Sequence, residues 1–416
     1  MTDHESAGAA EAGRPGTAVR RFPFAPSPRP ECAPDPGPGP DDPFAELREH
    51  DPVHLVELPF GGRARLVTRY EDVRTVLADP RFSRTAASRP DAPRFEPVPP
   101  PPVGVFVSDP PEHTRLRSLV AKAFTKRRVE AMRPGVRASV QTLIGRMKAA
   151  GPPADFVPDF ALPLPVAVIC DLFGIPEEDR ASFRQWCDGL LSTTSMTEEE
   201  IHASRRALFG YLSSLVAERR RKPADDLLSG LVRAHVAEDR LTEEELVVFS
   251  GGLLVAGYET SASQLANFTC LLLRTPDLWK QLGARPESVG TAVEELLRHV
   301  PSLEIGGFTR VATEDVELGG VLVRAGETLV PVLGSANHDP AVFDAPHRLD
   351  LERTPNPHIA FGYGPHRCVG AQLARVELQE AFRALPQACP ELRIAAEPRR
   401  KTGTIIHGLA SLPVSW

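Results

Sequence analysis

Residues 361–370 (FGYGPHRCVG) constrain the fold most, because they place one cysteine between a tight turn and a helix. Two glycines and a proline precede Cys368, and these residue types permit a turn whose backbone approaches a flat ligand closely. After Cys368, apolar residues recur at helical spacing as far as Leu385. The sequence therefore predicts a cysteine at a helix N-terminus, where the helix dipole and the unpaired N–H groups favour an anionic sulfur.

A lone cysteine has other interpretations. Most such residues are small buried hydrophobic groups. Zinc is a second alternative, because His366 lies two positions before Cys368. Structural zinc takes four nitrogen or sulfur ligands, however, and the chain contains no C-x-x-C pair to complete them. Haem iron needs a single proximal protein ligand, and thiolate is one that it accepts.

The whole pattern F-G-x-G-x-H-x-C-x-G resembles the haem-binding signature of the cytochrome P450 family. The resemblance implies that haem b is the cofactor and Cys368 its iron ligand, with Phe361, Gly362, His366 and Gly370 against the cofactor. Further motifs follow in the family's order across residues 43–416. The implied fold is mainly α with a small β region, and haem lies between a long distal helix and the proximal helix after Cys368.

The long helix is predicted from residue 242 to residue 274. Thr242 and Glu245 form a capping box, and about thirty residues of helical pattern follow, or about 45 Å at 1.5 Å per residue. Ala256 and Thr260 lie four residues apart on one face, and a threonine hydroxyl can donate to the carbonyl four residues earlier. Taken alone, the glycine between them would be only an accommodated helix residue.

Residues 256–260 (AGYET) resemble the family's A-G-x-[DE]-T motif. The resemblance implies that Thr260 hydrogen-bonds dioxygen, that Glu259 relays protons, and that Ala256 lies beside the cofactor. Thr260 and Glu259 are therefore the predicted catalytic residues.

His113 and Arg117 lie four residues apart at the start of another predicted helix, so both side chains reach from one face. Two such donors suit two carboxylates, although a solvated first turn would look the same. Residues 109–117 (DPPEHTRLR) also resemble a family motif. The resemblance implies that His113, Arg117, Arg310 and His366 hold the haem propionates.

Glu295 and Arg298 form an E-x-x-R pair on a predicted helix. The spacing alone says little, because it recurs at residues 71–74 and 130–133 and most such pairs are surface ion pairs. The resemblance adds a third partner, an arginine in a later segment, which we assign to Arg348.

Local patterns predict a β-hairpin from residues 54–58 and 64–68, and a second hairpin at Gly319 and Gly320. Thr68 and Glu71 predict a capping box for the helix that follows.

Residues 1–42 are rich in Gly, Ala, Pro and Asp and are predicted to be a largely disordered leader before a single domain at residues 43–416. The net charge of −7 argues against nucleic-acid binding. No apolar run reaches the roughly 18–20 residues that a bilayer crossing needs, and the N-terminus lacks a signal-peptide pattern. We expect a cytoplasmic monomer with no membrane contact.

The resemblance implies a haem-thiolate monooxygenase that hydroxylates or epoxidises a hydrophobic small molecule, expected to be a secondary-metabolite intermediate, free or bound to a carrier protein. Electrons would come from a ferredoxin and its NAD(P)H-dependent reductase, since no fused flavin or iron–sulfur segment is evident. Lys122, Lys126, Arg127 and Arg128 form a basic patch that is either solvated surface or, as in the family, a ferredoxin-docking face.

Two alternatives stay open. The same fold could catalyse oxidative coupling, cyclisation or desaturation, since that choice depends on how the substrate is held. A thiolate-haem gas sensor is the other, but a sensor would not need the acid and hydroxyl of Glu259 and Thr260. The substrate contacts are expected in five segments, residues 90–106, 183–196, 253–256, 303–308 and 403–406.

Overall fold

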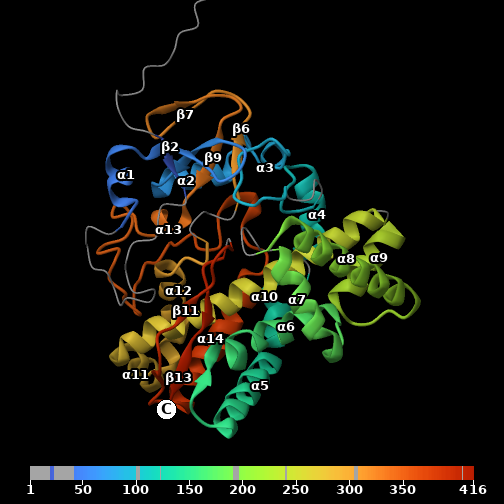
Figure 1. The fold of residues 1–416 in the computed structure, drawn as a ribbon, viewed down its shortest axis with the longest axis vertical. Coiled ribbons are helices and arrows are strands. Elements are labelled where there is room, and N and C mark those ends of the chain that lie inside the picture. The colour runs from blue at the N-terminus through green and yellow to red at the C-terminus, as the bar shows by residue number, and fades with distance from the viewer. Residues whose placement is uncertain are drawn as a thin grey trace, which may run out of the picture.

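The structure is a computed structural model that describes residues 19–22, 42–99, 104–121, 123–190, 196–238, 241–303, 308–404 and 406–416. Helices dominate, and a sheet covers one end of the helical body (Figure 1). The α-helices are α1 (Ala45–His50), α2 (Tyr70–Ala78), α3 (Arg84–Ala87), α4 (Glu112–Ala121), α5 (Lys126–Ala150), α6 (Pro163–Phe173), α7 (Arg180–Leu190), α8 (Glu198–Arg221), α9 (Leu227–Glu238), α10 (Glu243–Arg274), α11 (Pro276–Ala284), α12 (Val289–His299), α13 (Leu333–Ala336) and α14 (Ala371–Ala388).

The largest sheet has six strands in the order β1-β2-β3-β9-β6-β4, and smaller sheets have the orders β10-β13-β5, β11-β12 and β7-β8. The strands are β1 (Arg20–Arg21), β2 (Val53–Glu57), β3 (Arg63–Val67), β4 (Phe82–Ser83), β5 (Ala154–Asp155), β6 (Arg310–Ala312), β7 (Val316–Leu318), β8 (Val321–Val323), β9 (Thr328–Pro331), β10 (Arg393–Ile394), β11 (Arg399–Arg400), β12 (Leu409–Ser411) and β13 (Pro413–Ser415). Both predicted hairpins are confirmed, as antiparallel β2–β3 and β7–β8.

The long distal helix is confirmed as α10, whose 32 residues span about 48 Å at 1.5 Å per residue. The predicted capping box is present, because the Thr242 side chain accepts from the Glu245 N–H and the Glu245 carboxylate accepts from the Thr242 N–H. Apolar side chains are buried around most of the helix, which contacts α6, α8 and α14. This packing fixes α10 as a rigid wall through the core.

The predicted capping box at Thr68 is wrong. The Thr68 hydroxyl donates to the Pro52 carbonyl at 3.2 Å, and α2 begins at Tyr70. The Tyr70 N–H donates to Asp339 Oδ2 at 2.9 Å, so a residue remote in sequence satisfies the helix start. A local pattern cannot show such a partner.

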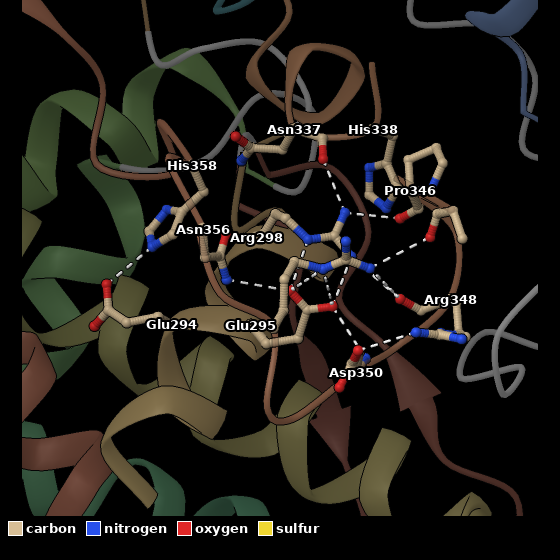
Figure 2. Close-up of polar contacts among 12 residues, drawn as sticks. Glu294, Glu295, Arg298, Asn337, His338, Pro346, Arg348, Asp350, Asn356 and His358 are labelled. Carbon is tan, nitrogen blue, oxygen red and sulfur yellow. Dashed lines mark hydrogen bonds and ion pairs between the residues drawn. The ribbon is translucent and has the colours of Figure 1, made fainter. Parts of the chain in front are cut away.

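The E-x-x-R pair lies fully buried on α12, where Glu295 binds Arg298 through two contacts of 2.7 Å (Figure 2). The assignment of Arg348 as third partner is wrong. The Arg348 side chain is 67% exposed and pairs with Asp350 instead. Arg353 binds the Glu295 carboxylate at 3.0 and 3.1 Å, because the turn after Pro346 brings it back under α12.

Part of the predicted leader belongs to the fold. Strand β1 pairs parallel with β2, and the Phe22 ring behind it packs edge-on against Phe44 and Phe95. Residues 1–18 and 23–41 lie outside the described part of the chain, so the division at residue 43 stays a prediction. Within the described ranges, no helix has the length and apolar character that crossing a membrane requires.

Candidate active site

The Cys368 loop, residues 361–370, is a tight turn that its glycines make possible. Gly362 and Gly364 have φ values of +73° and +70°, in the left-handed region that favours glycine. A Cβ at Gly364 would lie 2.6 Å from the Leu77 carbonyl oxygen, so the loop docks closely on the end of α2. The Cys368 N–H donates to the Phe361 carbonyl at 2.8 Å, and Gly370 caps α14. The predicted helix N-terminus after the cysteine is confirmed.

Opposite the Cys368 loop, the middle of α10 presents a face made of small side chains. The Thr260 hydroxyl donates to the Ala256 carbonyl at 2.9 Å, as its spacing predicts. Ala256 is exposed although it lies mid-helix in the core, because its side faces a cavity. On the other side a Cβ at Gly257 would lie 2.7 Å from Ile169 Cδ1, so glycine lets α6 approach α10 closely.

Between these two walls lies a cavity of about 270 Å³. Among the residues that line it are ten of the eleven predicted site residues: His113, Arg117, Ala256, Thr260, Arg310, Phe361, Gly362, His366, Cys368 and Gly370. The sequence motifs come from four separate parts of the chain, and the fold brings them together. Of the predicted substrate segments, only residues 105, 106, 253, 256, 303 and 308 reach this cavity among those described.

Cationic and donor side chains crowd one end of the cavity. The rings of His113 and His366 lie 4.1 Å apart, and the buried Nε2 of His113 has no hydrogen-bond partner among the described residues. Burial lowers the pKa of His366 to about 2, and the nearby charges of Arg310 and His113 add to this effect. Burial likewise lowers the pKa of Arg310 to about 9. Burying these cationic and donor groups together is electrostatically unfavourable when no ligand is bound. An anionic ligand would offset this repulsion and desolvation.

The environment of the Cys368 sulfur is mixed. Burial raises the pKa of the thiol, while a hydrogen bond from the Gly370 N–H and the charges of Arg117, Arg367 and Arg375 act in the opposite direction. Burial has the larger effect, so the net direction is a raised pKa for this thiol. A thiolate here calls for a metal cation at the sulfur.

Glu259 is the one predicted site residue that does not line the cavity. Its side chain is 3% exposed, and Oε1 accepts from the Lys401 ammonium and from the Ser263 hydroxyl. Lys401 follows β11 near the end of the chain, 142 positions after Glu259. No motif in the sequence points to this partner.

Glu377 is a second acid that sequence reasoning missed. It lies on α14, lines the cavity together with Ser261, and is 1% exposed. Its Oε2 has no hydrogen-bond partner among the described residues, and burial raises its pKa to about 8. A buried carboxyl nine positions after Cys368 was the available signal, because helical periodicity places an apolar residue there.

The cavity fits haem b on three observations. One cysteine sulfur faces it from the Cys368 loop, and this sulfur would be a single proximal ligand. Buried cationic and donor groups, including an unpartnered His113 nitrogen, gather where two carboxylates would be accepted. The opposite wall is made by the small Ala256 and the hydroxyl of Thr260. Within the described residues, no cluster of His, Cys, Asp or Glu could hold a bare metal ion instead.

Comparison with known proteins agrees. The family model described as Cytochrome P450 matches residues 49–284 and 289–389. Nocardicin C N-oxygenase of Nocardia uniformis subsp. tsuyamanensis is 50% identical over 377 residues, which cover 90% of this chain and 94% of that protein. Mycinamicin IV hydroxylase/epoxidase of Micromonospora griseorubida is 47% identical with the same coverage. The crystal structure of HinD with NMFT and NO matches with a TM-score of 0.90 at 46% identity, covering 96% of this chain and 100% of that chain.

The fold and the cavity define a haem-thiolate protein, with a cysteine loop on one side and a long helix on the other. The chain belongs to the cytochrome P450 family. Haem b is the family's cofactor, and the relatives are hydroxylases, epoxidases and N-oxygenases, so this chain is an oxidoreductase of the monooxygenase type. The predicted family, fold class, cofactor and enzyme class are thus confirmed, while the roles of individual site residues stay predictions.

Proposed function

We propose that the enzyme hydroxylates or epoxidises a hydrophobic intermediate of secondary metabolism. The observation that carries the proposal is one cavity in which Cys368, the cationic cluster and the Thr260 face of α10 meet an apolar wall. That wall includes Val105, Phe106, Leu253, Leu303 and Phe308. Two relatives are named for nocardicin C and mycinamicin IV, which supports a secondary metabolite as the substrate class.

Cys368 would bind the iron, and His113, Arg117, Arg310 and His366 would hold the propionates. When bound, haem supplies the activation of dioxygen, and a thiolate ligand favours cleavage of the O–O bond. The protein's part is to exclude water with apolar residues, hold the substrate beside α10 and deliver protons from that side.

Proton delivery is assigned to Thr260 and Glu259. The Thr260 hydroxyl lies at the cavity wall, where its oxygen can accept a hydrogen bond while its own hydrogen is directed to the Ala256 carbonyl. Glu259 is held by Lys401 just behind that wall, so it would supply protons from outside the cavity.

Electrons would come from a ferredoxin and its NAD(P)H-dependent reductase. Lys126, Arg127 and Arg128 are exposed at the start of α5, the helix that packs against α14 behind Cys368. An acidic protein would be attracted to this basic patch. Lys122, the fourth residue of the predicted patch, lies outside the described residues. We further propose that the enzyme is a monomer. We also propose that it acts in the cytoplasm, where reduced nicotinamide cofactors are available.

The test is the absorption spectrum of the purified ferric protein, titrated with apolar biosynthetic intermediates, free and carrier-bound. A substrate should move the haem band from its low-spin to its high-spin position, and turnover should give a product one oxygen atom heavier. A product that has lost two hydrogens without gaining oxygen would favour coupling, cyclisation or desaturation. Absence of a haem band would contradict the assignment of Cys368.

The same turnover assay tests the distal residues. Thr260→Ala should lower the fraction of reductant that appears in product by about tenfold or more, because general acid–base catalysis contributes typically about 10²–10⁴-fold in rate. Thr260→Ser, which keeps the hydroxyl, should stay near the parent. Parental coupling in Thr260→Ala would show that Thr260 does not manage protons.

A further inference from the structure

Glu294 and Glu295 are neighbours on α12, yet their side chains serve different parts of the molecule (Figure 2). Glu295 completes the buried pair with Arg298. Glu294 turns toward the segment that leads into the Cys368 loop, where its Oε2 accepts from His358 Nε2 at 2.9 Å. Both Glu294 oxygens also accept from Arg375, from Nε and Nη2, each at 2.7 Å. A two-point contact of this kind fixes the orientation of the guanidinium as well as its distance.

The charge state of this cluster follows from its hydrogen bonds. His358 Nδ1 accepts from the Ala360 N–H at 3.2 Å, so the ring donates to Glu294 through its Nε2 hydrogen. Burial opposes ionisation of Glu294, but the bonds from His358 and Arg375 outweigh it and lower its pKa to about 2. The cluster thus consists of one fixed anion and one fixed cation.

Arg375 connects this cluster to the cysteine. Its guanidinium carbon lies 4.5 Å from the centre of the Phe361 ring, a cation–π distance. The Phe361 carbonyl in turn accepts from the Cys368 N–H at 2.8 Å. Arg375 also lies seven positions after Cys368 on the first turns of α14, so its positive charge belongs to the same helix start as the sulfur.

We propose that Glu294 and Arg375 are a charge-tuning pair for the Cys368 sulfur. Arg375 is a positioning residue that stabilises electron density at the sulfur, and Glu294 holds that cation in place while offsetting part of its charge. The inference rests on the proposed role of Cys368 as the iron ligand. Because reduction adds an electron at this centre, the cation favours the reduced protein and the carboxylate favours the oxidised protein.

The experiment is a redox titration of the haem-loaded protein, read from its absorption spectrum at a fixed mediator potential. Arg375→Gln should lower the ratio of reduced to oxidised protein about fivefold or more, and Glu294→Gln should raise it by a comparable factor. Arg375→Lys, which keeps the charge, should stay near the parent. Arg383→Gln is the matched control on the same helix, where the arginine donates to Pro286, and should leave the ratio unchanged.

Opposite shifts separate charge tuning from a merely structural role, which would move both variants in one direction. Shifts of the same sign, or no shift in Glu294→Gln, would overturn the inference. If Arg375→Gln does not retain haem, the ratio of reduced to oxidised protein in Glu294→Gln decides whether the inference holds. Failure of the proposed function would show differently, as a parent protein without a haem band.

Discussion

At the residue scale, the site depends on groups that are unfavourable where they are placed. Glu377 is a carboxyl enclosed at the cavity wall beside Ser261, and Arg310 and His366 are donors whose charged forms burial disfavours. Such perturbed groups gather where a ligand or a reaction uses them. Burying these groups lowers the stability of the folded protein, and this loss of stability can be measured.

Glu377→Gln should make that cost visible through its pH dependence. The pKa of Glu377 is raised to about 8 by burial, whereas an exposed glutamate titrates near 4.5. As pH rises between these values, the unfolded chain ionises and the folded protein does not, so the parent loses stability. Glutamine carries no such penalty. The melting temperature of the variant, relative to the parent, should therefore be higher at pH 8.5 than at pH 5.

The matched control is Glu317→Gln, at an exposed position of β7. Its melting temperature should track that of the parent across the same pH range. A Glu377→Gln difference that is flat with pH would show that the carboxyl is ionised in the folded protein at neutral pH.

Which residues could be predicted depends on where their partners lie. Cys368, Thr260 and His113 sit in contiguous motifs whose residue types and spacing carry the information locally. Lys401 and Arg353 were missed because each meets its acid, Glu259 or Glu295, from a remote segment. The sequence points to Arg348 rather than Arg353 because it shows which residues are near in the chain but not how a turn redirects them.

At the element scale, the Cys368 loop is held by its contact with α2. Gly364 combines a positive φ with a Cβ position that backbone atoms of Leu77 and Ala78 already occupy, at 2.6 and 2.9 Å. Backbone cannot move aside as a flexible side chain can. The glycine pattern predicted the turn, but the helix against which it packs could not be read from it.

Gly364→Ala should therefore destabilise the protein by about 2–3 kcal/mol, the sum of left-handed strain and a backbone clash. Gly326→Ala isolates the first contribution, because Gly326 has a φ of +88° with no atom within 4 Å of the added Cβ. That variant should lose only about 1 kcal/mol. Denaturant unfolding and the fraction of haem retained are the measurements. Equal losses in both variants would mean that the α2 contact is not tight.

Long elements were predictable because their signals are local. The capping box at Thr242 and the apolar pattern behind it define α10 without reference to other segments. The start of α2 is different, since Asp339 satisfies it from 269 residues away.

At the scale of the whole molecule, the described part of the N-terminal segment closes the edge of the largest sheet. Phe22 is 1% exposed and contacts Phe44, the residue before α1, and Phe95, which lies in the loop after α3. Composition predicts a largely disordered leader here, because its high Gly and Pro content does not show which of the few apolar residues pack against the fold.

Phe22→Ala should cost about 3 kcal/mol, the lower end for removing a buried aromatic ring, since the site is at a sheet edge. Leu322→Ala, at a side chain 42% exposed on β8, should change stability by less than about 0.5 kcal/mol. Denaturant unfolding of the haem-loaded proteins compares them. An effect of Phe22→Ala as small as that of Leu322→Ala would place β1 outside the cooperative fold.

Through its contact with Glu259, Lys401 near the end of the chain helps to hold an acid in the middle of α10. A register irregularity falls between Arg399 and Arg400, immediately before the lysine. Because side chains alternate across a strand, inserting or deleting one residue there would turn Lys401 to the opposite side. Natural drift or deliberate redesign of this hairpin could thus alter how the acid of α10 is held while leaving α10, the cysteine loop and the cavity wall untouched. The residues around Lys401 can therefore vary without any change in the residues that line the cavity.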